Sequence, residues 1–168
     1  MLYLIGFMGV GKTTIGKQIA TLNKVVFIDT DSQIEKKTSR SIKEIFETDG
    51  EIAFRKLETD TIRSINRKSV IACGGGLPVH NNNIEYLKYK GTVIYLKAST
   101  ETLIKRLDKK KNKRPLISNL TNAKRLEFIR KILKDREKTY KQADYTIETD
   151  NKTVKEVLRE INSLFSFC

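Results

Sequence analysis

Residues 6–13 follow the pattern G-x-x-x-x-G-K-[ST], in which Lys12 and Thr13 occupy the last two positions. An apolar segment precedes this loop and a helical pattern follows it, which is the setting in which the pattern binds phosphate. Glycines let backbone N–H groups turn toward phosphate oxygens, and the helix N-terminus adds a positive dipole. We therefore expect a nucleotide-binding loop, with Lys12 at the β- and γ-phosphates and Thr13 on Mg²⁺. The alternative is a glycine-rich turn that carries a surface lysine.

Two carboxylates, Asp29 and Asp31, follow the second apolar segment of the chain. In an extended chain, side chains two residues apart point to the same side, so both carboxylates would face one cleft. One carboxylate near Mg²⁺ and one near an acceptor hydroxyl would serve phosphoryl transfer. The alternative is an Asx turn or a helix N-cap, because a helical pattern follows Asp31.

Two arginines lie on apolar stripes of predicted helices. Arg136 completes the stripe of a helix between about 122 and 141. An arginine on an inward face needs an anion or an acceptor, because burying an unpaired charge is costly, and its fork suits a carboxylate. Arg55 has a similar placement on an earlier helix, and an ion pair with Glu51 or Glu58 is its alternative.

Three successive glycines and one basic segment complete the candidate residues. Gly74, Gly75 and Gly76 follow an apolar segment and permit close approach of the backbone to a ligand, although a flexible turn is the alternative. The segment 108–118 is basic and contains Arg114. We expect it to be a lid that closes over ATP and brings Arg114 to the transferring phosphate, with an ordinary solvated loop as the alternative.

The elements that position these residues alternate along the chain. Continuous apolar segments separated by amphipathic helices predict a parallel sheet covered by helices on both faces. Such sheets bind ligands beyond the carboxyl ends of their strands, where the motifs above lie. The expected strands are 2–5, 25–28, 69–73, 92–96 and 145–147. The expected helices follow the phosphate loop, then cover 34–46 as two short pieces, about 51–65, the region of 103–107, about 122–141 and about 154–165.

Composition limits the function classes. The 168 residues, 39% of them hydrophobic and 32% charged, suit one globular domain, and no apolar run approaches the roughly 20 residues of a membrane span. The net charge of +13 is spread along the chain, and its densest run, 109–114, has no interleaved aromatic residue for base stacking. We expect a cytoplasmic monomer with a small anionic substrate and with neither nucleic acid nor membrane as a partner. Cys73, Cys168 and His80 have no disulfide or metal-ligand spacing.

Together these motifs resemble the shikimate kinase family over nearly the whole chain. The residues that carry the resemblance are 6–13, 29–31, 54–55, 74–76, 114–116 and Arg136. The resemblance implies a P-loop fold of the nucleoside-monophosphate-kinase type, with a five-stranded parallel sheet in the order 2-3-1-4-5. It also implies transfer from MgATP to the 3-hydroxyl of shikimate, which is a step toward chorismate and the aromatic amino acids.

The resemblance assigns roles to individual residues. Arg55 and Arg136 would bind the substrate carboxylate, and Asp31 would hold the ring hydroxyls, including the attacking one. Gly75 and Gly76 would place backbone N–H groups near the substrate, and Gly74 would also belong to the substrate-binding residues. Asp29 would reach Mg²⁺, while Lys12 and Arg114 would neutralise charge on the γ-phosphate and Arg106 would stack on adenine. A substrate-binding subdomain would cover about 31–61. The expected nucleotide contacts are Gly9, Val10, Gly11, Lys12, Thr13, Thr14, Arg106 and Arg114.

Two features depart from the family pattern. Cys73 stands before the glycines where threonine, serine or a small aliphatic residue is more common, and the lid is unusually rich in lysine. Two other functions remain open from the residues alone. One is another small-metabolite kinase of the gluconate or nucleotide type. The other is a non-catalytic nucleotide- or nucleic-acid-binding protein that uses the positive charge.

Overall fold

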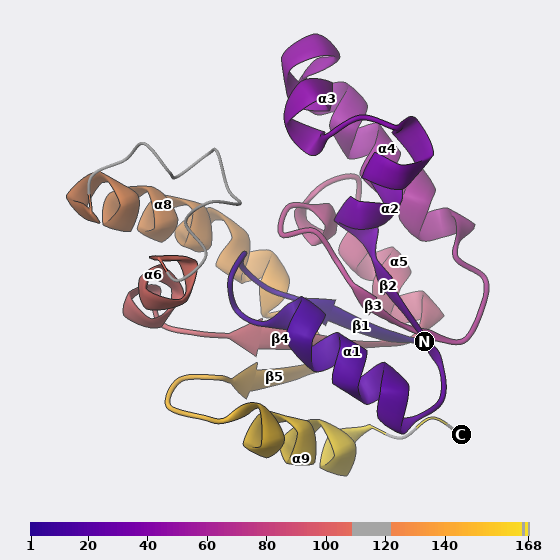
Figure 1. Cartoon of the computed structure of the whole chain (residues 1–168), viewed down its shortest axis with the longest axis vertical. Coiled ribbons are helices and arrows are strands. Elements are labelled where there is room, and N and C mark those ends of the chain that lie inside the picture. The colour runs from indigo at the N-terminus through magenta and orange to yellow at the C-terminus, as the bar shows by residue number, and fades with distance from the viewer. Residues whose placement is uncertain (109–121, 166, 168) are drawn as a thin grey trace.

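Five short parallel strands form one sheet in the order β2-β3-β1-β4-β5, which confirms the expected order (Figure 1). The computed structural model describes residues 1–108, 122–165 and 167. The strands are β1 (Leu2–Ile5), β2 (Val26–Asp29), β3 (Ser69–Ala72), β4 (Thr92–Lys97) and β5 (Tyr145–Glu148). β1 lies in the centre, paired with β3 and β4, so the loop that follows β1 emerges from the middle of the sheet.

Helices cover both faces of this sheet, as the continuous apolar strands predict. The helices are α1 (Lys12–Leu22), α2 (Thr30–Thr38), α3 (Ile42–Thr48), α4 (Gly50–Ser64), α5 (Asn83–Lys90), α6 (Thr100–Asp108), α8 (Asn122–Tyr140) and α9 (Val154–Leu164). The strand β1 shows how the faces separate, because its side chains alternate between two hydrophobic clusters. Leu2 and Leu4 pack with residues of α1, α6, α8 and α9. Tyr3 and Ile5 pack with residues of α4 and α5.

The helices α2 and α3 and the first part of α4 lie beyond the end of β2 (Figure 1), whereas the last part of α4 packs on the sheet through Ile62. They enclose a small core of Ile34, Ile45 and Phe54. Ser39, with a φ of 52°, ends α2, which places the break between α2 and α3 in the region that the sequence predicts. A capping box between Ser41 and Glu44 then starts α3.

One helix and one turn have no counterpart among the predicted elements. The 3₁₀ turn η1 (Leu77–Val79) and the helix α5 lie between β3 and β4. The buried apolar residues of α5 are only Ile84 and Leu87, and so short a stripe gives little periodicity to detect. Both elements bring the chain from the glycine turn back to the start of β4.

The predicted lid lies almost entirely outside the described residues, and Arg114 lies there with it. The helix α6 ends at Asp108, and the next described helix is α8, which begins at Asn122. An ion pair between Asp108 and the buried Arg125 joins these two helices. Within the described parts of the chain, no helix combines the length and apolar character needed to cross a bilayer.

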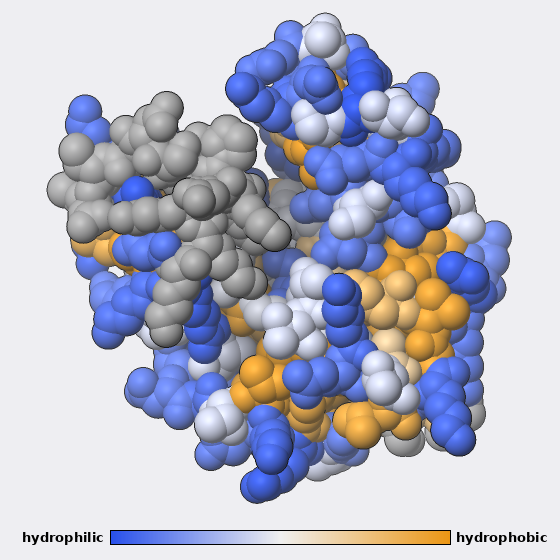
Figure 2. Space-filling model, in the orientation of Figure 1, coloured by the Kyte–Doolittle hydropathy of each residue, from blue (hydrophilic) through white to orange (hydrophobic). Residues whose placement is uncertain are grey.

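The surface agrees with the basic composition. Hydrophilic residues cover most of the face shown in Figure 2. Hydrophobic residues gather on the side of α1 and the edge strand β2, where Leu22 and Val26 are exposed.

Candidate active site

The phosphate loop follows β1 and opens α1, as its pattern predicts. Gly6, Gly9 and Gly11 have φ values of 135°, 84° and 113°, which residues other than glycine rarely adopt. The Lys12 ammonium folds back over the loop and donates to the carbonyl oxygens of Gly6 at 2.8 Å and Phe7 at 3.0 Å. The glycines therefore allow the backbone conformation of the loop, and the hydrogen bonds of Lys12 hold its side chain against the loop.

The guanidinium of Arg106 ties α6 to the phosphate loop. It donates to the carbonyl oxygen of Val10 at 3.0 Å, and to Thr149 through both the side-chain hydroxyl at 2.9 Å and the carbonyl at 2.7 Å. Arg106 thus lies beside the loop, on the side of the segment that follows β5. Its stacking on adenine stays a prediction.

Thr13 and Asp29 meet at the end of β2. The Thr13 hydroxyl donates to one carboxylate oxygen of Asp29 at 2.9 Å, and the other oxygen accepts from the backbone N–H of Ser32 at 3.3 Å. Asp29 is therefore the N-cap of α2 as well as the neighbour of the phosphate loop. A hydroxyl and a carboxylate are the hard oxygen ligands that Mg²⁺ prefers, alongside water and phosphate oxygens. These two residues fit that ion.

Asp31 reaches the site by a different route from the one that its spacing predicts. The chain is not extended there, because α2 begins at Thr30, directly after its cap Asp29. The prediction that alternation in a strand aligns the two aspartates is therefore wrong. Asp31 lies in the first turn of α2 instead, and a Cβ built on Gly74 would collide with its Oδ1 atom.

The buried Thr30 fastens this turn to the glycines. Its hydroxyl accepts a hydrogen bond from the Gly74 N–H at 2.8 Å and donates to the carbonyl of Ala72 at 3.4 Å. The partners are more than 40 residues apart in sequence, so no local pattern reveals the contact. Thr30 fixes the distance between the start of α2 and the end of β3.

Each glycine of the triplet faces one of the predicted substrate-binding side chains. The pairs are Gly74 with Asp31, Gly75 with Arg136, and Gly76 with Arg55. A Cβ at Gly75 would lie 3.0 Å from an Arg136 nitrogen, and one at Gly76 would overlap the Arg55 guanidinium. The φ of Gly76 is −88°, so space rather than backbone strain requires a glycine there. The triplet is a close approach between backbone and charged side chains.

Arg55 makes the ion pairs that were its alternative interpretation and still lies beside Gly76. Its guanidinium donates to Glu51 at 2.8 Å and to Glu58 at 2.7 Å. It also lies over the rings of Phe46 at 5.8 Å and Phe54 at 5.4 Å. These contacts hold the fork in place against the glycine turn.

Glu58 belongs to this cluster although the sequence reasoning treats it only as a helical partner of Arg55. Its side chain is 2% exposed. Burial raises its pKa to about 7, with the Arg55 ion pair opposing that shift and the Asp31 charge adding to it. Phe54, Glu58 and Ile62 are all buried at four-residue spacing on α4, and this spacing was the available signal.

The raised pKa of Glu58 predicts a specific pH dependence of stability. The folded protein keeps a proton on Glu58 that the unfolded chain, with a pKa near 4.5, releases. The stability from that proton is present below about pH 4.5 and is lost as the pH rises to about 7. Glu58→Gln removes the titration. Its unfolding free energy relative to the unsubstituted protein should therefore rise by roughly 1–3 kcal/mol between about pH 5 and pH 8 in urea titrations.

Glu51→Gln is the matched control for this measurement. Glu51 shares the Arg55 guanidinium but is exposed, and its hydrogen bond from Arg55 lowers its pKa. The stability that Glu51 contributes is therefore fully present above the pKa of this residue in the unfolded chain. The difference in unfolding free energy between Glu51→Gln and the unsubstituted protein should thus stay constant from pH 5 to pH 8. The prediction fails if the two variants show the same pH profile.

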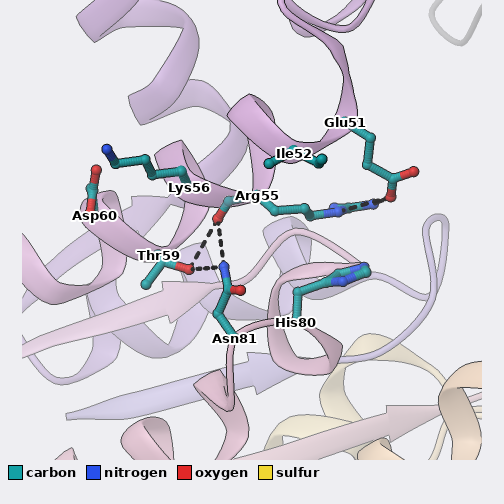
Figure 3. A pocket seen from close by; sticks show the side chains of 8 residues that line it. All are labelled: Glu51, Ile52, Arg55, Lys56, Thr59, Asp60, His80 and Asn81. Carbon is teal, nitrogen blue, oxygen red and sulfur yellow. Dashed lines mark hydrogen bonds and ion pairs between the residues drawn. The ribbon is translucent and has the colours of Figure 1, made fainter.

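A pocket of about 560 Å³ opens beside this cluster, between α4 and the turn after η1 (Figure 3). Asn81 spans its floor, donating to the Thr59 hydroxyl at 3.0 Å and to the Arg55 carbonyl at 3.4 Å. Of the predicted substrate-binding residues, Arg55 lines this pocket, whereas the glycines, Asp31 and Arg136 do not. The lining residues are Glu51, Ile52, Arg55, Lys56, Thr59, Asp60, His80 and Asn81.

Comparison with known proteins identifies the family. Residues 8–165 match the family model for shikimate kinase. Over 160 residues the chain is 44% identical to a shikimate kinase of Caldanaerobacter subterraneus subsp. tengcongensis, and the match covers 94% of this chain and 91% of that one. The chain belongs to the shikimate kinase family.

Solved structures of shikimate kinases share the fold. The enzyme from Bacteroides thetaiotaomicron matches with a TM-score of 0.92 and 31% identity, covering 97% of this chain and 96% of that one. The enzyme from Acinetobacter baumannii, solved in complex with shikimate, matches with a TM-score of 0.87 and 39% identity, covering 97% and 90%. This shikimate kinase family member is thus a kinase, and the matches favour neither alternative function.

Proposed function

We propose that this chain transfers the γ-phosphoryl group of ATP to the 3-hydroxyl of shikimate, giving shikimate 3-phosphate and ADP. The observation that carries the proposal is the glycine turn after β3, where Asp31, Arg136 and Arg55 each lie against one glycine. Two arginines and two carboxylates, Asp31 and Glu58, lie around this turn, and Glu58 is paired with Arg55. The arginines together with Asp31 suit an acceptor that has both a carboxylate and hydroxyl groups. The phosphate loop follows the neighbouring strand β1, so donor and acceptor would meet at one edge of the sheet.

The acceptor side would be divided by charge. Arg55 and Arg136 would bind the substrate carboxylate, with backbone N–H groups of the glycine turn beside them. Asp31 would accept hydrogen bonds from the ring hydroxyls, including the one that attacks. Because Glu51 and Glu58 already hold the Arg55 fork, this arginine would be oriented before the substrate arrives.

The donor side would be the phosphate loop and α6. Lys12 would leave its backbone acceptors for the β- and γ-phosphates, and Arg106 would lie near the adenine. Mg²⁺, bound with ATP, would neutralise charge on the phosphates that Thr13 and Asp29 face. Arg114, outside the described residues, would add a second positive charge at the γ-phosphate.

The transfer depends mainly on aligning the acceptor oxygen with the γ-phosphorus and the leaving oxygen. The 3-oxygen of shikimate forms a bond to the γ-phosphorus while the bond from that phosphorus to the β–γ bridging oxygen breaks, and ADP leaves. The hydroxyl proton passes to Asp31. Because the transition state is loose, positive charge around the γ-phosphate and a fixed acceptor matter more than a strong base.

The organisation of the chain fits this division of work. The layer of α2, α3 and α4 would be the substrate-binding subdomain, with bounds of about 31–61, in a single kinase domain of residues 1–168. We further propose that the enzyme acts as a cytoplasmic monomer on a small-molecule substrate, with no nucleic-acid or membrane partner.

An acceptor panel tests the proposal. ADP release from MgATP is followed with shikimate, gluconate, AMP and no acceptor in parallel. The proposal expects release that depends on shikimate and stays at background in the other arms. Release that depends on gluconate or AMP instead would overturn the substrate and the roles of Arg55, Arg136 and Asp31, while leaving the phosphate loop in place.

A further inference from the structure

Tyr140 is a fully buried residue whose hydroxyl reaches the glycine turn. It is the last residue of α8, and its ring packs against Tyr95 of β4 at 5.0 Å between centroids. Its hydroxyl donates to the carbonyl oxygen of Gly75 at 2.5 Å, across 65 residues of sequence. A buried tyrosine hydroxyl needs such a partner, but here the partner belongs to the turn that faces the substrate side chains.

The same hydroxyl lies beside Arg136. Arg136 is one helical turn before Tyr140 on the same side of α8, and its positive charge acts to lower the pKa of the tyrosine hydroxyl. A Cβ on Gly75 would lie 3.0 Å from the Arg136 nitrogen and 3.6 Å from the Tyr140 oxygen. The tyrosine hydroxyl is therefore bonded to the glycine backbone and lies next to the arginine.

The bond to Gly75 has a consequence for the next residue. No described peptide bond is cis. In a trans peptide the carbonyl of one residue and the N–H of the next point in opposite directions. Holding the Gly75 carbonyl on the α8 side therefore turns the Gly76 N–H away from α8. Glycine has more backbone freedom than any other residue, so this peptide plane depends on such a restraint.

We propose that Tyr140 is a positioning residue for the substrate carboxylate, because it orients both the Arg136 guanidinium and the Gly76 N–H. The inference rests on the proposed function, which places the substrate carboxylate at Arg136 and the glycine turn. Burial raises the pKa of the Tyr140 hydroxyl, so it stays protonated and able to donate over the working pH range.

Tyr140→Phe tests the role by removing one oxygen from a packed ring. We expect KM for shikimate to rise about 5- to 10-fold, the usual effect of one lost hydrogen bond, with KM for ATP within about twofold. Tyr95→Phe is the matched control, because it removes a hydroxyl from the ring that packs against Tyr140. We expect it to leave both KM values within about twofold. Unfolding in urea would be measured for both variants.

A second measurement needs no substrate. Nitrogen–proton NMR of the protein alone should show the Gly76 amide resonance shifted by Tyr140→Phe and unshifted by Tyr95→Phe. An unmoved Gly76 resonance, an unchanged KM for shikimate, or equal losses for shikimate and ATP would each overturn the positioning role. If the unsubstituted protein fails to phosphorylate shikimate, the proposed function falls, and the NMR comparison still decides whether Tyr140 orients the turn.

Discussion

Replacing Lys12 with alanine is expected to lower kcat by about 100-fold or more while the protein stays folded. The Lys12 ammonium is the positive charge that the phosphate loop places at the β- and γ-phosphates. It stabilises the transition state most strongly, because negative charge then shifts toward the leaving oxygen. In the structure this ammonium donates to the carbonyl oxygens of Gly6 and Phe7 in the loop. Steady-state kinetics together with thermal unfolding separates the two effects.

Lys17→Ala is the control for this variant. Lys17 lies on the same helix, α1, but on its exposed side. We expect it to keep kcat within about twofold, as surface substitutions usually do. If Lys12→Ala retains turnover close to that of Lys17→Ala, the phosphate-loop role of Lys12 is refuted.

Replacing Arg136 with alanine is expected to raise KM for shikimate by about 30-fold or more, with KM for ATP within about twofold. Truncating one partner of a buried charge pair costs roughly 2–5 kcal/mol, much of it from the partner left unpaired. The partner here would be the substrate carboxylate, so the loss should follow shikimate alone. Initial rates with each substrate varied in turn measure the split.

Arg130→Ala provides the comparison on the same helix. Arg130 is exposed and makes one long ion pair with Glu101 at 3.4 Å, at the surface between α8 and α6. Such pairs contribute little, so both KM values should stay within about twofold. Equal losses for shikimate and ATP in Arg136→Ala would instead make Arg136 a structural arginine of the helix.

Much of the fold could be predicted because its signals are local. Four of the five strands carry a short apolar run that is followed by a polar or glycine residue, and β5 is the exception. The phosphate-loop pattern predicts which strand leads into the nucleotide site. The break at Ser39 and the start of α3 at Ser41 follow from residues that favour turns and caps. The helix α5 was missed because its two buried residues, Ile84 and Leu87, give no periodic stripe.

The site was less predictable because its contacts join distant segments. Asp29 lies beside Thr13 of the phosphate loop and Asp31 beside Gly74. The predicted geometry was wrong, because Asp29 caps a helix that begins at Thr30, and Asp31 therefore lies in a helix and not in an extended chain. Thr30 bonds to Gly74 across 44 residues, and Tyr140 to Gly75 across 65. In the sequence Tyr140 is only one more apolar member of a helical stripe. The hydrogen bond of its hydroxyl can be seen only in the folded structure, where the glycine turn lies against α8.

The most direct test of the proposed reaction is to find where the phosphate goes. The protein is incubated with MgATP and shikimate, and the products are examined by phosphorus–proton correlation NMR. The proposed reaction predicts one new phosphorus signal that correlates with the proton on carbon 3 of shikimate and grows in step with ADP. A correlation with a proton on another carbon, or ADP formation without any phosphorylated shikimate, would contradict it.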